Sequence, residues 1–422
     1  MRFHFLPGLN NYQRSVLIAT ALSVVAIVSY WRIGICALTL LAVCAVVKII
    51  ASKKIGNPAL SKPARICLYA MVAYWMLYVI SACYSQNHAE GWNTVAIKVL
   101  FLVLPLLLIA GDTRYVTHQH LRGLLAILVA TLCIRFAICV ALSVWNCLHG
   151  MSATEAFRWN YDPLGLHHNY LALYILVAEA LLYVNLVSTI GIKRCRWIRW
   201  SSVLAAVILS TYLYMSGSRS GIAALLLLIV ACLIHLAIFK RQWVVALAAA
   251  LFVGIFGYGL SHISDTISDR YAQTAEELSE GTSSDVRLWL LECGLETAKQ
   301  ELVFGYGSGD YELALKESYI RHGYIDRLQN LGSHNQYLET VLETGLIGLA
   351  VLLIMLLLPT AIAIATHRNW LLCAAPTLAV MSQIFFESML NRQMGVQLIT
   401  LLYCIMIVGL SISPTCNLSR HE

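Results

Sequence analysis

Three basic side chains occur in surroundings that suit them to chemistry. Arg219 lies in the stretch SGSRSG, Arg287 in DVRLWLL and His334 in SHNQYLET. An arginine presents a planar fork of N–H donors that matches phosphate oxygens. A histidine with a pKa of about 6.5 is largely neutral at pH 7 and can accept a proton. These residue types therefore indicate a site that binds a substrate anion and transfers a proton.

Each of the three residues also has a purely structural interpretation. Arg219 fits an anchor at a membrane interface, and Arg287 fits a side chain that pairs with a structural carboxylate or extends to water. His334 fits a helix cap or a packing residue. The sequence around each residue leaves both interpretations open.

The glutamates that follow His334 raise a separate question. On the helix expected there, Glu339 and Glu343 project from the face opposite His334, at the start of a long apolar run. Ionisable side chains are costly in a membrane helix and are candidates for a functional site. We therefore expect each glutamate to have a specific partner.

A further polar segment, AFRWNYDPLGLHHNY, precedes another apolar run. It holds the candidate substrate-binding residues Arg158 and His168, together with His167 and Asn169. The sequence does not decide which of them touches substrate. Its aromatic residues fit either an interfacial belt or a surface for stacking on sugar rings.

Three ionisable residues fall inside apolar runs: Arg135, Glu179 and Glu387. Either a structural pair or a transport path accounts for Arg135 and Glu179, and the role of Glu387 is open.

The composition places all these residues in a membrane protein. Of 422 residues, 59% are hydrophobic and 12% are charged, with a mean hydropathy of +0.72. This leaves too little polar surface for a soluble globule. Twelve apolar runs have about the length that a spanning helix needs, near 15–31, 33–51, 66–84, 95–110, 121–143, 169–190, 201–215, 221–239, 243–261, 337–358, 370–388 and 395–412. We expect an all-α, polytopic integral membrane protein.

The charge distribution predicts the orientation and the domains. Short links on one side are rich in lysine and arginine, which places them and both termini in the cytoplasm. The expected organisation is nine helices within 1–260, one large periplasmic loop at 261–336, and three helices with a cytoplasmic tail within 337–422. The loop holds 13 of the 22 acidic residues. Its stretch 283–300 predicts a helix with Ser284 as N-cap, on which Arg287 shares an apolar stripe with Leu291.

Several function classes lack support. The cysteines form no CxxC pair, no GxxxxGK[ST] motif is present, and no paired-aspartate motif for sugar nucleotides is visible. We therefore expect no metal, no cofactor and no nucleic-acid partner.

Taken together, the order SGSRSG, VRLWLLECGLETAKQELVFGYGSGDY and SHNQYLETVLETGLIGLAV resembles the O-antigen ligase and polymerase superfamily of bacterial inner membranes. The resemblance is strongest to the lipopolysaccharide O-antigen ligases, which are integral-membrane glycosyltransferases. It extends over roughly 158–352; the other spans agree in number and topology.

The resemblance implies a function and roles for residues. A ligase of this family transfers O-antigen from undecaprenyl diphosphate to the outer-core sugar of lipid A-core at the periplasmic face, by inversion and without a metal. By resemblance His334 is the catalytic histidine and Arg219 and Arg287 bind the diphosphate. Arg158, His168 and Asn335 complete the candidate substrate-binding residues.

Two alternatives remain at the level of sequence. An O-antigen polymerase uses the same donor with a second lipid-linked repeat as acceptor. A transporter of lipid-linked oligosaccharides accounts for the many spans, but the polar residues gather on the outer side and no internal repeat is visible.

Overall fold

The computed structural model describes residues 8–157, 162–189, 196–263, 283–328 and 331–412. Within these ranges the chain forms helices and no β-strand, which confirms the predicted all-α class. The candidate Arg158 lies outside the described residues, as does the middle of the predicted loop, 264–282.

The first part of the chain contains six long or medium helices and the second part four. The first six are α1 (Asn11–Ser29), α2 (Trp31–Ser52), α3 (Lys62–Tyr84), α4 (His88–Ile97), α5 (Leu100–Ala110) and α6 (His118–Leu148). A short turn, α7 (Ala153–Ala156), precedes α8 (His168–Thr189), α9 (Arg196–Ser216), α10 (Arg219–Ile234) with its π-helical extension η2 (His235–Phe239), and α11 (Trp243–Ile263).

The third part begins inside the predicted loop. It comprises α13 (Ser283–Gln300), α14 (Tyr311–Arg321), α15 (Ile325–Leu328), α16 (Gln336–Ala365), α17 (Leu371–Phe386), the 3-10 turn η3 (Met389–Asn391) and α18 (Gln393–Ser411). The helix predicted at 283–300 is confirmed. Because α13 already begins at Ser283, the prediction that Ser284 is its N-cap is wrong: Ser284 lies inside the first turn.

Nine of the described helices are long and apolar enough to cross a membrane, which makes this a multi-pass membrane protein. The α4–α5 pair, bent by 42°, passes the same test as one broken span, and α11 and α17 contribute shorter apolar helices. With these included, a helix coincides with each of the twelve predicted runs. How many of them cross the bilayer stays a prediction.

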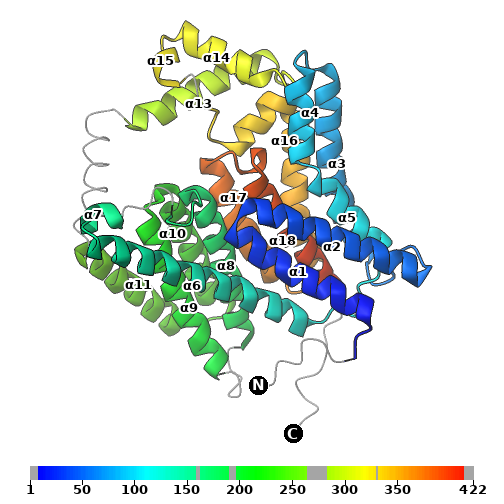
Figure 1. Ribbon diagram of the computed structural model, residues 1–422, viewed down its shortest axis with the longest axis vertical. Coiled ribbons are helices and arrows are strands. Elements are labelled where there is room, and N and C mark those ends of the chain that lie inside the picture. Colours follow the sequence, from blue (N-terminus) through cyan, green and yellow to red (C-terminus); the bar gives the residue numbers. More distant parts are fainter. Residues whose placement is uncertain (1–7, 158–161, 190–195, 264–282, 329–330, 413–422) are drawn as a thin grey trace.

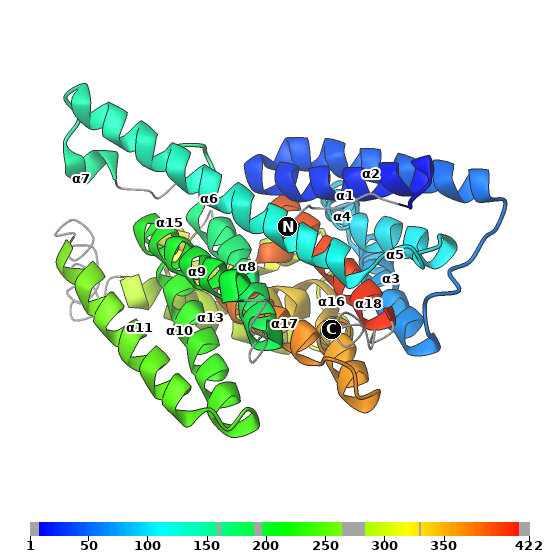
Figure 2. The ribbon, with the colours of Figure 1, turned by 90° about the horizontal axis from the view of Figure 1, so that it is seen from below.

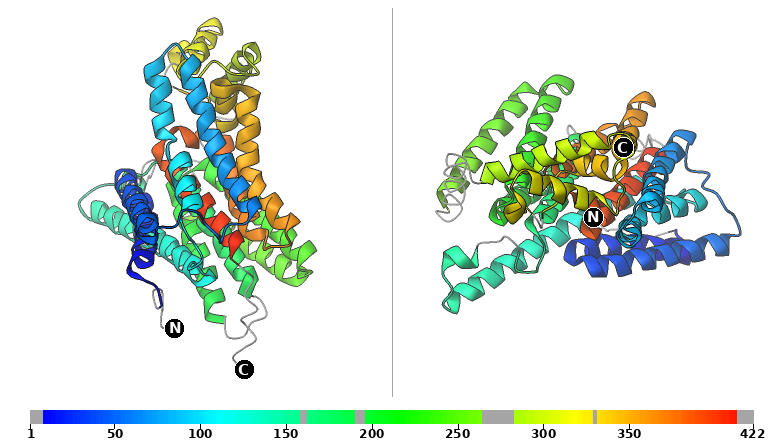
Figure 3. Two further views of the ribbon diagram at one scale, coloured as in Figure 1. Left: turned by 90° about the vertical axis from the view of Figure 1, so that its right-hand side faces the viewer. Right: turned by 90° about the horizontal axis from the view of Figure 1, so that it is seen from above.

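The helices are arranged around α8, α17 and α18. In Figure 2, α9, α10 and α11 lie on one side of these three and α1 to α5 on the other. The spanning windows of α8 and α18 are 72% and 83% buried inside the protein, far more than those of the other spans. Figures 1 and 3 show α13, α14 and α15 at one end of the molecule, above the first turns of α16.

A kink in α16 fastens the α13–α15 helices to the bundle. At Gly345 the backbone has a φ of 69°, which a side chain would strain. The segment after α13 fills the break: Tyr306 N–H donates to the Leu342 carbonyl over 2.8 Å, and Leu346 N–H donates to the Leu302 carbonyl over 2.9 Å. A Cβ at residue 345 would meet the Val303 carbonyl at 2.0 Å. The kink therefore requires glycine.

A buried arginine pair corrects one expectation. A structural pair with Glu179 was one of two accounts of Arg135, but its guanidinium instead forms two bonds to Asp162, of 2.6 and 2.8 Å, in a buried site. Tyr212 also donates to this carboxylate over 2.8 Å. Glu179 instead accepts a bond from Ser210. The pair is satisfied on both sides and holds the segment before α8 against α6.

Candidate active site

His334 sits in the turn before α16 and forms a pair with Glu387. Its Nδ1 atom lies 2.9 Å from Glu387 Oε1, and the imidazole keeps 38% of its surface exposed while the carboxyl keeps 15%. The backbone of His334 is left-handed, with a φ of 48°. Such conformations are uncommon outside glycine, asparagine, aspartate and histidine and often occur at functional sites. The turn thus presents an accessible imidazole on a fixed carboxylate.

Asn169 connects this pair to two other segments. Its Nδ2 atom donates to Glu387 Oε2 over 2.6 Å, and its Oδ1 atom accepts bonds from Ser218 and Ser220 over 3.2 and 3.3 Å. The Asn169 carbonyl accepts a further bond from Gln383. One continuous chain of hydrogen bonds therefore joins the starts of α8 and α10, the turn before α16 and the end of α17.

Arg219 lies between the two serines of this chain. It is the first residue of α10, whose N-cap is Ser218, and its side chain is exposed while Ser218 and Ser220 are buried. The serines and the arginine of the stretch SGSRSG thus have different roles. Its serines fix the helix start against Asn169, and the arginine between them projects from the same rigid turn.

Arg287 lies on α13 and differs from expectation in its burial. The residues of α13 that pack inward are Leu290, Cys293, Gly294, Thr297 and Ala298, and a Cβ at Gly294 would meet Leu338 of α16. Arg287 is exposed and so is Leu291. The stripe that Arg287 shares with Leu291 is therefore not a buried face at these two positions, and Arg287 lies on the exposed face of the helix.

The electrostatics of the pair favour a base at His334. The hydrogen bond with Glu387 raises the pKa of His334, burial acts in the opposite direction, and the charge of Arg287 lowers it slightly; the net direction is upward. Burial raises the pKa of Glu387, but the hydrogen bond and charge of His334, together with the hydrogen bonds from Asn169 and Ser388, outweigh burial, so the carboxyl pKa is lowered. An ionised Glu387 accepts the Nδ1 proton and leaves Nε2 of the neutral imidazole to receive another.

The remaining candidates have more limited roles in the geometry. The His167 and His168 rings stack with centroids 4.2 Å apart. Burial, and then the charge of His168, lowers the pKa of His167 to about 4; Glu387 acts in the opposite direction. Asn335 is the N-cap of α16, since its Oδ1 atom accepts from the Tyr337 and Leu338 N–H groups. That contact gives Asn335 a structural role; substrate binding by it and by His168 stays a prediction.

The buried Glu339 bonds to both loops that carry the pair, the one before α16 with His334 and the one after α17 with Glu387. The Oε2 atom of this buried glutamate accepts from Ser333, over 2.6 Å, and from Ser388. These serines directly precede His334 and follow Glu387. Its Oε1 atom accepts from Tyr311 of α14 and from Asn391 of η3. A single carboxylate therefore sets the spacing between the two members of the pair.

Lys98 supplies the positive charge in this buried network. Its ammonium donates to Asn391 Oδ1 over 2.8 Å, lies 3.9 Å from Glu343 Oε1 and stands 4.2 Å above the Tyr78 ring. Tyr78 donates to Glu343 over 2.7 Å. The Lys98 and Glu343 side chains are both fully buried. The expectation that Glu339 and Glu343 have specific partners is thus confirmed.

Sequence reasoning identified His334 but not what holds it. Glu387 was noted as an ionisable residue in an apolar run without a role, and Asn169 only as a neighbour of His168. The signal for both was their type: an ionisable residue and an amide next to spans. Among the described residues, no group of three or more His, Cys, Asp or Glu is placed to hold a metal ion.

The segment of the chain that contains Arg219, Arg287 and His334 matches a known protein family. Residues 204–353 match the family described as O-antigen ligase. This segment is therefore similar to the O-antigen ligase family, and it lies within a multi-pass membrane protein.

A second protein is similar to part of this chain. A protein of Haemophilus influenzae, described as uncharacterized, is 24% identical over 191 residues, which are 41% of this chain and 46% of that protein. The similarity thus spans about half the length of that relative, and its description carries no activity.

Proposed function

We propose that this protein is an O-antigen ligase of the bacterial inner membrane. In this proposal it transfers an O-antigen glycan from undecaprenyl diphosphate to the outer-core sugar of lipid A-core, at the periplasmic face. The loop region 261–336 supplies α13 and α14 above the site, and both termini are cytoplasmic. No nucleotide is required, because the donor already carries a diphosphate leaving group, and two arginines take the place of a metal in stabilising its charge.

The observation that carries the proposal is the chain from His334 through Glu387 and Asn169 to Ser218 and Ser220. It supports a general base that is oriented from behind by a carboxylate, the arrangement that activates a hydroxyl nucleophile. It also supports a common site for Arg219 and His334, since the start of α10 is fixed to the partner of the imidazole.

The proposed reaction is a single displacement. The acceptor hydroxyl oxygen attacks the anomeric carbon while Nε2 of His334 takes its proton. The bond between the anomeric carbon and the phosphate oxygen breaks, and its electron pair stays on the diphosphate. Attack from the face opposite the leaving group inverts the anomeric configuration. Proton transfer must coincide with attack, because imidazole is too weak to ionise a sugar hydroxyl beforehand.

The proposed role of Arg219 and Arg287 is to hold the diphosphate as its charge grows. Both side chains are exposed, that of Arg219 at the start of α10 and that of Arg287 on α13. The charge of Arg287 acts on the pKa of His334, which supports its place near the site. A preorganised donor of this kind contributes about 2.7–4 kcal/mol to the transition state.

The test is a reconstituted transfer with purified protein, lipid-linked glycan and lipid A-core, without nucleotide and with chelator. The wild type is expected to form glycosylated lipid A-core. Arg219→Lys and Arg287→Lys are expected to lower kcat roughly 100- to 1,000-fold, since lysine cannot reproduce the fork of donors. Arg321→Lys is the matched control, because Arg321 pairs with Glu296 on the same group of helices. Full transfer by either site variant contradicts the assignment.

The acceptor separates the ligase from a polymerase. If a second lipid-linked repeat is elongated while lipid A-core stays unmodified, the protein is a polymerase and the ligase proposal fails. Movement of lipid-linked glycan between leaflets without any new glycosidic bond indicates the transporter alternative. The O-antigen ligase domain supports a transferase over that alternative.

A further inference from the structure

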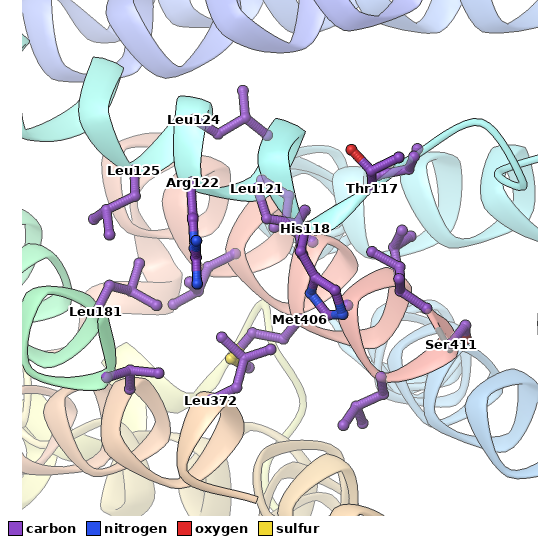
Figure 4. Close-up of a pocket in the computed structure, with 18 of the residues that line it drawn as sticks. Thr117, His118, Leu121, Arg122, Leu124, Leu125, Leu181, Leu372, Met406 and Ser411 are labelled. Atoms are coloured by element: carbon purple, nitrogen blue, oxygen red, sulfur yellow. The ribbon is translucent and has the colours of Figure 1, made fainter. Parts of the chain in front are cut away.

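A second polar region lies at the other end of the same helices. A cavity of about 1250 Å³ opens among α1, α6, α8, α17 and α18 (Figure 4). The helix α8 begins beside His334, at His168, and reaches the cavity at its far end, where Ser188 is part of the lining. Along α8 the lining begins at Val177, nine residues or roughly 14 Å from His168, and it continues to Ser188. The cavity is therefore distinct from the candidate active site.

The walls of the cavity are apolar over a long distance. Leucine, isoleucine, valine and methionine side chains line it from all five helices, among them Leu124, Leu128, Leu181, Leu401 and Met406. Along α18 the lining extends from Leu398 to Ser411, which is roughly 20 Å at the helical rise. One leaflet of a bilayer core is roughly 15 Å thick. The cavity is thus deep enough for an extended acyl chain.

The mouth of the cavity is basic. Its lining includes Arg114, His118, Arg122, His367 and Arg368, and none of the described residues that line it is acidic. Figure 4 shows the side chains of Arg122 and His118 directed from α6 into the space beside Leu181 and Met406. The cavity thus combines a positive entrance with an apolar interior.

Arg114 and Arg368 have partners in the structure, and only the partner of Arg114 carries a charge that opposes binding of an anion. Arg114 forms an ion pair with Asp112 just outside the lining. Arg368 donates through Nη1 to the Ile412 carbonyl, which fixes its guanidinium at the mouth without neutralising its charge. Arg122 and Arg368 therefore remain as the groups best placed to receive an anion there.

We infer that this cavity binds one phospholipid with an anionic headgroup. The phosphate lies at Arg122 and Arg368, and the acyl chains lie along α6, α8 and α18. Basic pockets between spanning helices on the cytoplasmic side suit such headgroups. Arginines at a cytoplasmic helix end are common in any membrane protein, but that preference alone does not produce an apolar cavity leading inward from them.

The test measures lipid binding by the full-length protein in detergent, with native mass spectrometry and thermal unfolding as readouts. Phosphatidylglycerol is expected to bind and to raise the unfolding temperature, whereas phosphatidylcholine is expected to do neither at the same concentration. Each arginine near a headgroup contributes about a fivefold change in affinity. Arg122→Gln with Arg368→Gln is therefore expected to weaken phosphatidylglycerol binding roughly 25-fold.

Two further variants keep the test specific. Arg14→Gln removes an exposed arginine of α1 that does not line the cavity, and it is expected to leave binding unchanged. Leu181→Trp fills the apolar part and is expected to abolish binding while the mouth stays intact. Equal binding of phosphatidylcholine, undiminished binding by the double variant, or the same stabilisation by inorganic phosphate alone overturns the inference.

Discussion

The Nδ1 atom of His334 lies 2.9 Å from Oε1 of Glu387, although 53 residues separate the two along the chain. This contact turns an exposed histidine into an oriented base, because an ionised carboxylate fixes which ring nitrogen carries the proton. Its other oxygen is held by Asn169, so the orientation depends on three separate segments.

The first prediction concerns the base itself. His334→Asn keeps a residue that tolerates the left-handed backbone at this position but removes the titratable nitrogen. We expect kcat to fall roughly 100- to 10,000-fold, the usual contribution of a general base, with little change in thermal unfolding. The measurement is single-turnover transfer with saturating donor. Activity within tenfold of wild type contradicts a role for His334 in proton transfer.

The second prediction concerns pH. Transfer requires neutral His334, so the rate rises with pH through the raised pKa of this residue. Glu387→Gln removes the charge that raises this pKa, and the acidic limb of the kcat profile is expected to move to lower pH while the maximum rate falls. A profile from pH 5 to 9 measures the shift. Glu179→Gln, which alters a carboxylate bonded to Ser210, is the control and leaves the limb in place.

The same pair has a consequence for stability. The pKa of His334 is raised in the folded protein, so its contribution is present at low pH and is lost as pH rises through the folded value. The pKa of Glu387 is lowered, so its contribution is present above the unfolded value and is lost as pH falls through the folded one. The contact between His334 and Glu387 therefore stabilises the folded protein most at pH values between the lowered pKa of Glu387 and the raised pKa of His334.

Local sequence signals were sufficient for the helices and for the separate motifs. Hydrophobic runs depend only on neighbouring residues, and each predicted run contains a helix. His334 was recognisable because an imidazole and an amide next to an apolar run are costly without a purpose. The N-cap role of Asn335 was less apparent, since it depends on where the helix begins.

The partners could not be predicted because they are remote in sequence. Asn169 and Glu387 are 218 residues apart, and Lys98 and Asn391 are 293 apart. No periodicity relates such positions; only the packing of the helices that carry them brings them together. The exposed position of Arg287 was missed for a related reason, since the buried face of α13 is chosen by its contact with Leu338 of α16.

The third prediction concerns spacing within the pair. Glu339→Gln weakens the contacts to Ser333 and Ser388, which flank His334 and Glu387. We expect a lower kcat with an almost unchanged KM, and an acidic limb displaced to lower pH, because the charge of Glu339 also raises the pKa of His334. The displacement is expected to be smaller than for Glu387→Gln.

The control for this variant is Glu312→Gln. Glu312 is exposed on α14, forms an ion pair with Lys316 and makes a long contact of 3.5 Å with the Tyr311 hydroxyl, but it bonds to neither serine. A loss of stability in Glu339→Gln without any movement of the pH limb indicates that Glu339 only supports the fold. Restoration of the wild-type limb by Glu339→Asp supports positioning by the carboxylate.

The fourth prediction concerns the buried charges beneath the site. Lys98→Met leaves Glu343 without its ammonium partner in a fully buried position. Removing one member of such a pair costs about 3–5 kcal/mol, because the other charge stays buried and unpaired. We expect this loss in the free energy of unfolding, measured by chemical denaturation of the solubilised protein. Adding Glu343→Gln removes the orphan charge, so the double variant is expected to recover much of the stability. If it is as unstable as Lys98→Met, the ammonium acts through Asn391 and the η3 turn instead of through Glu343.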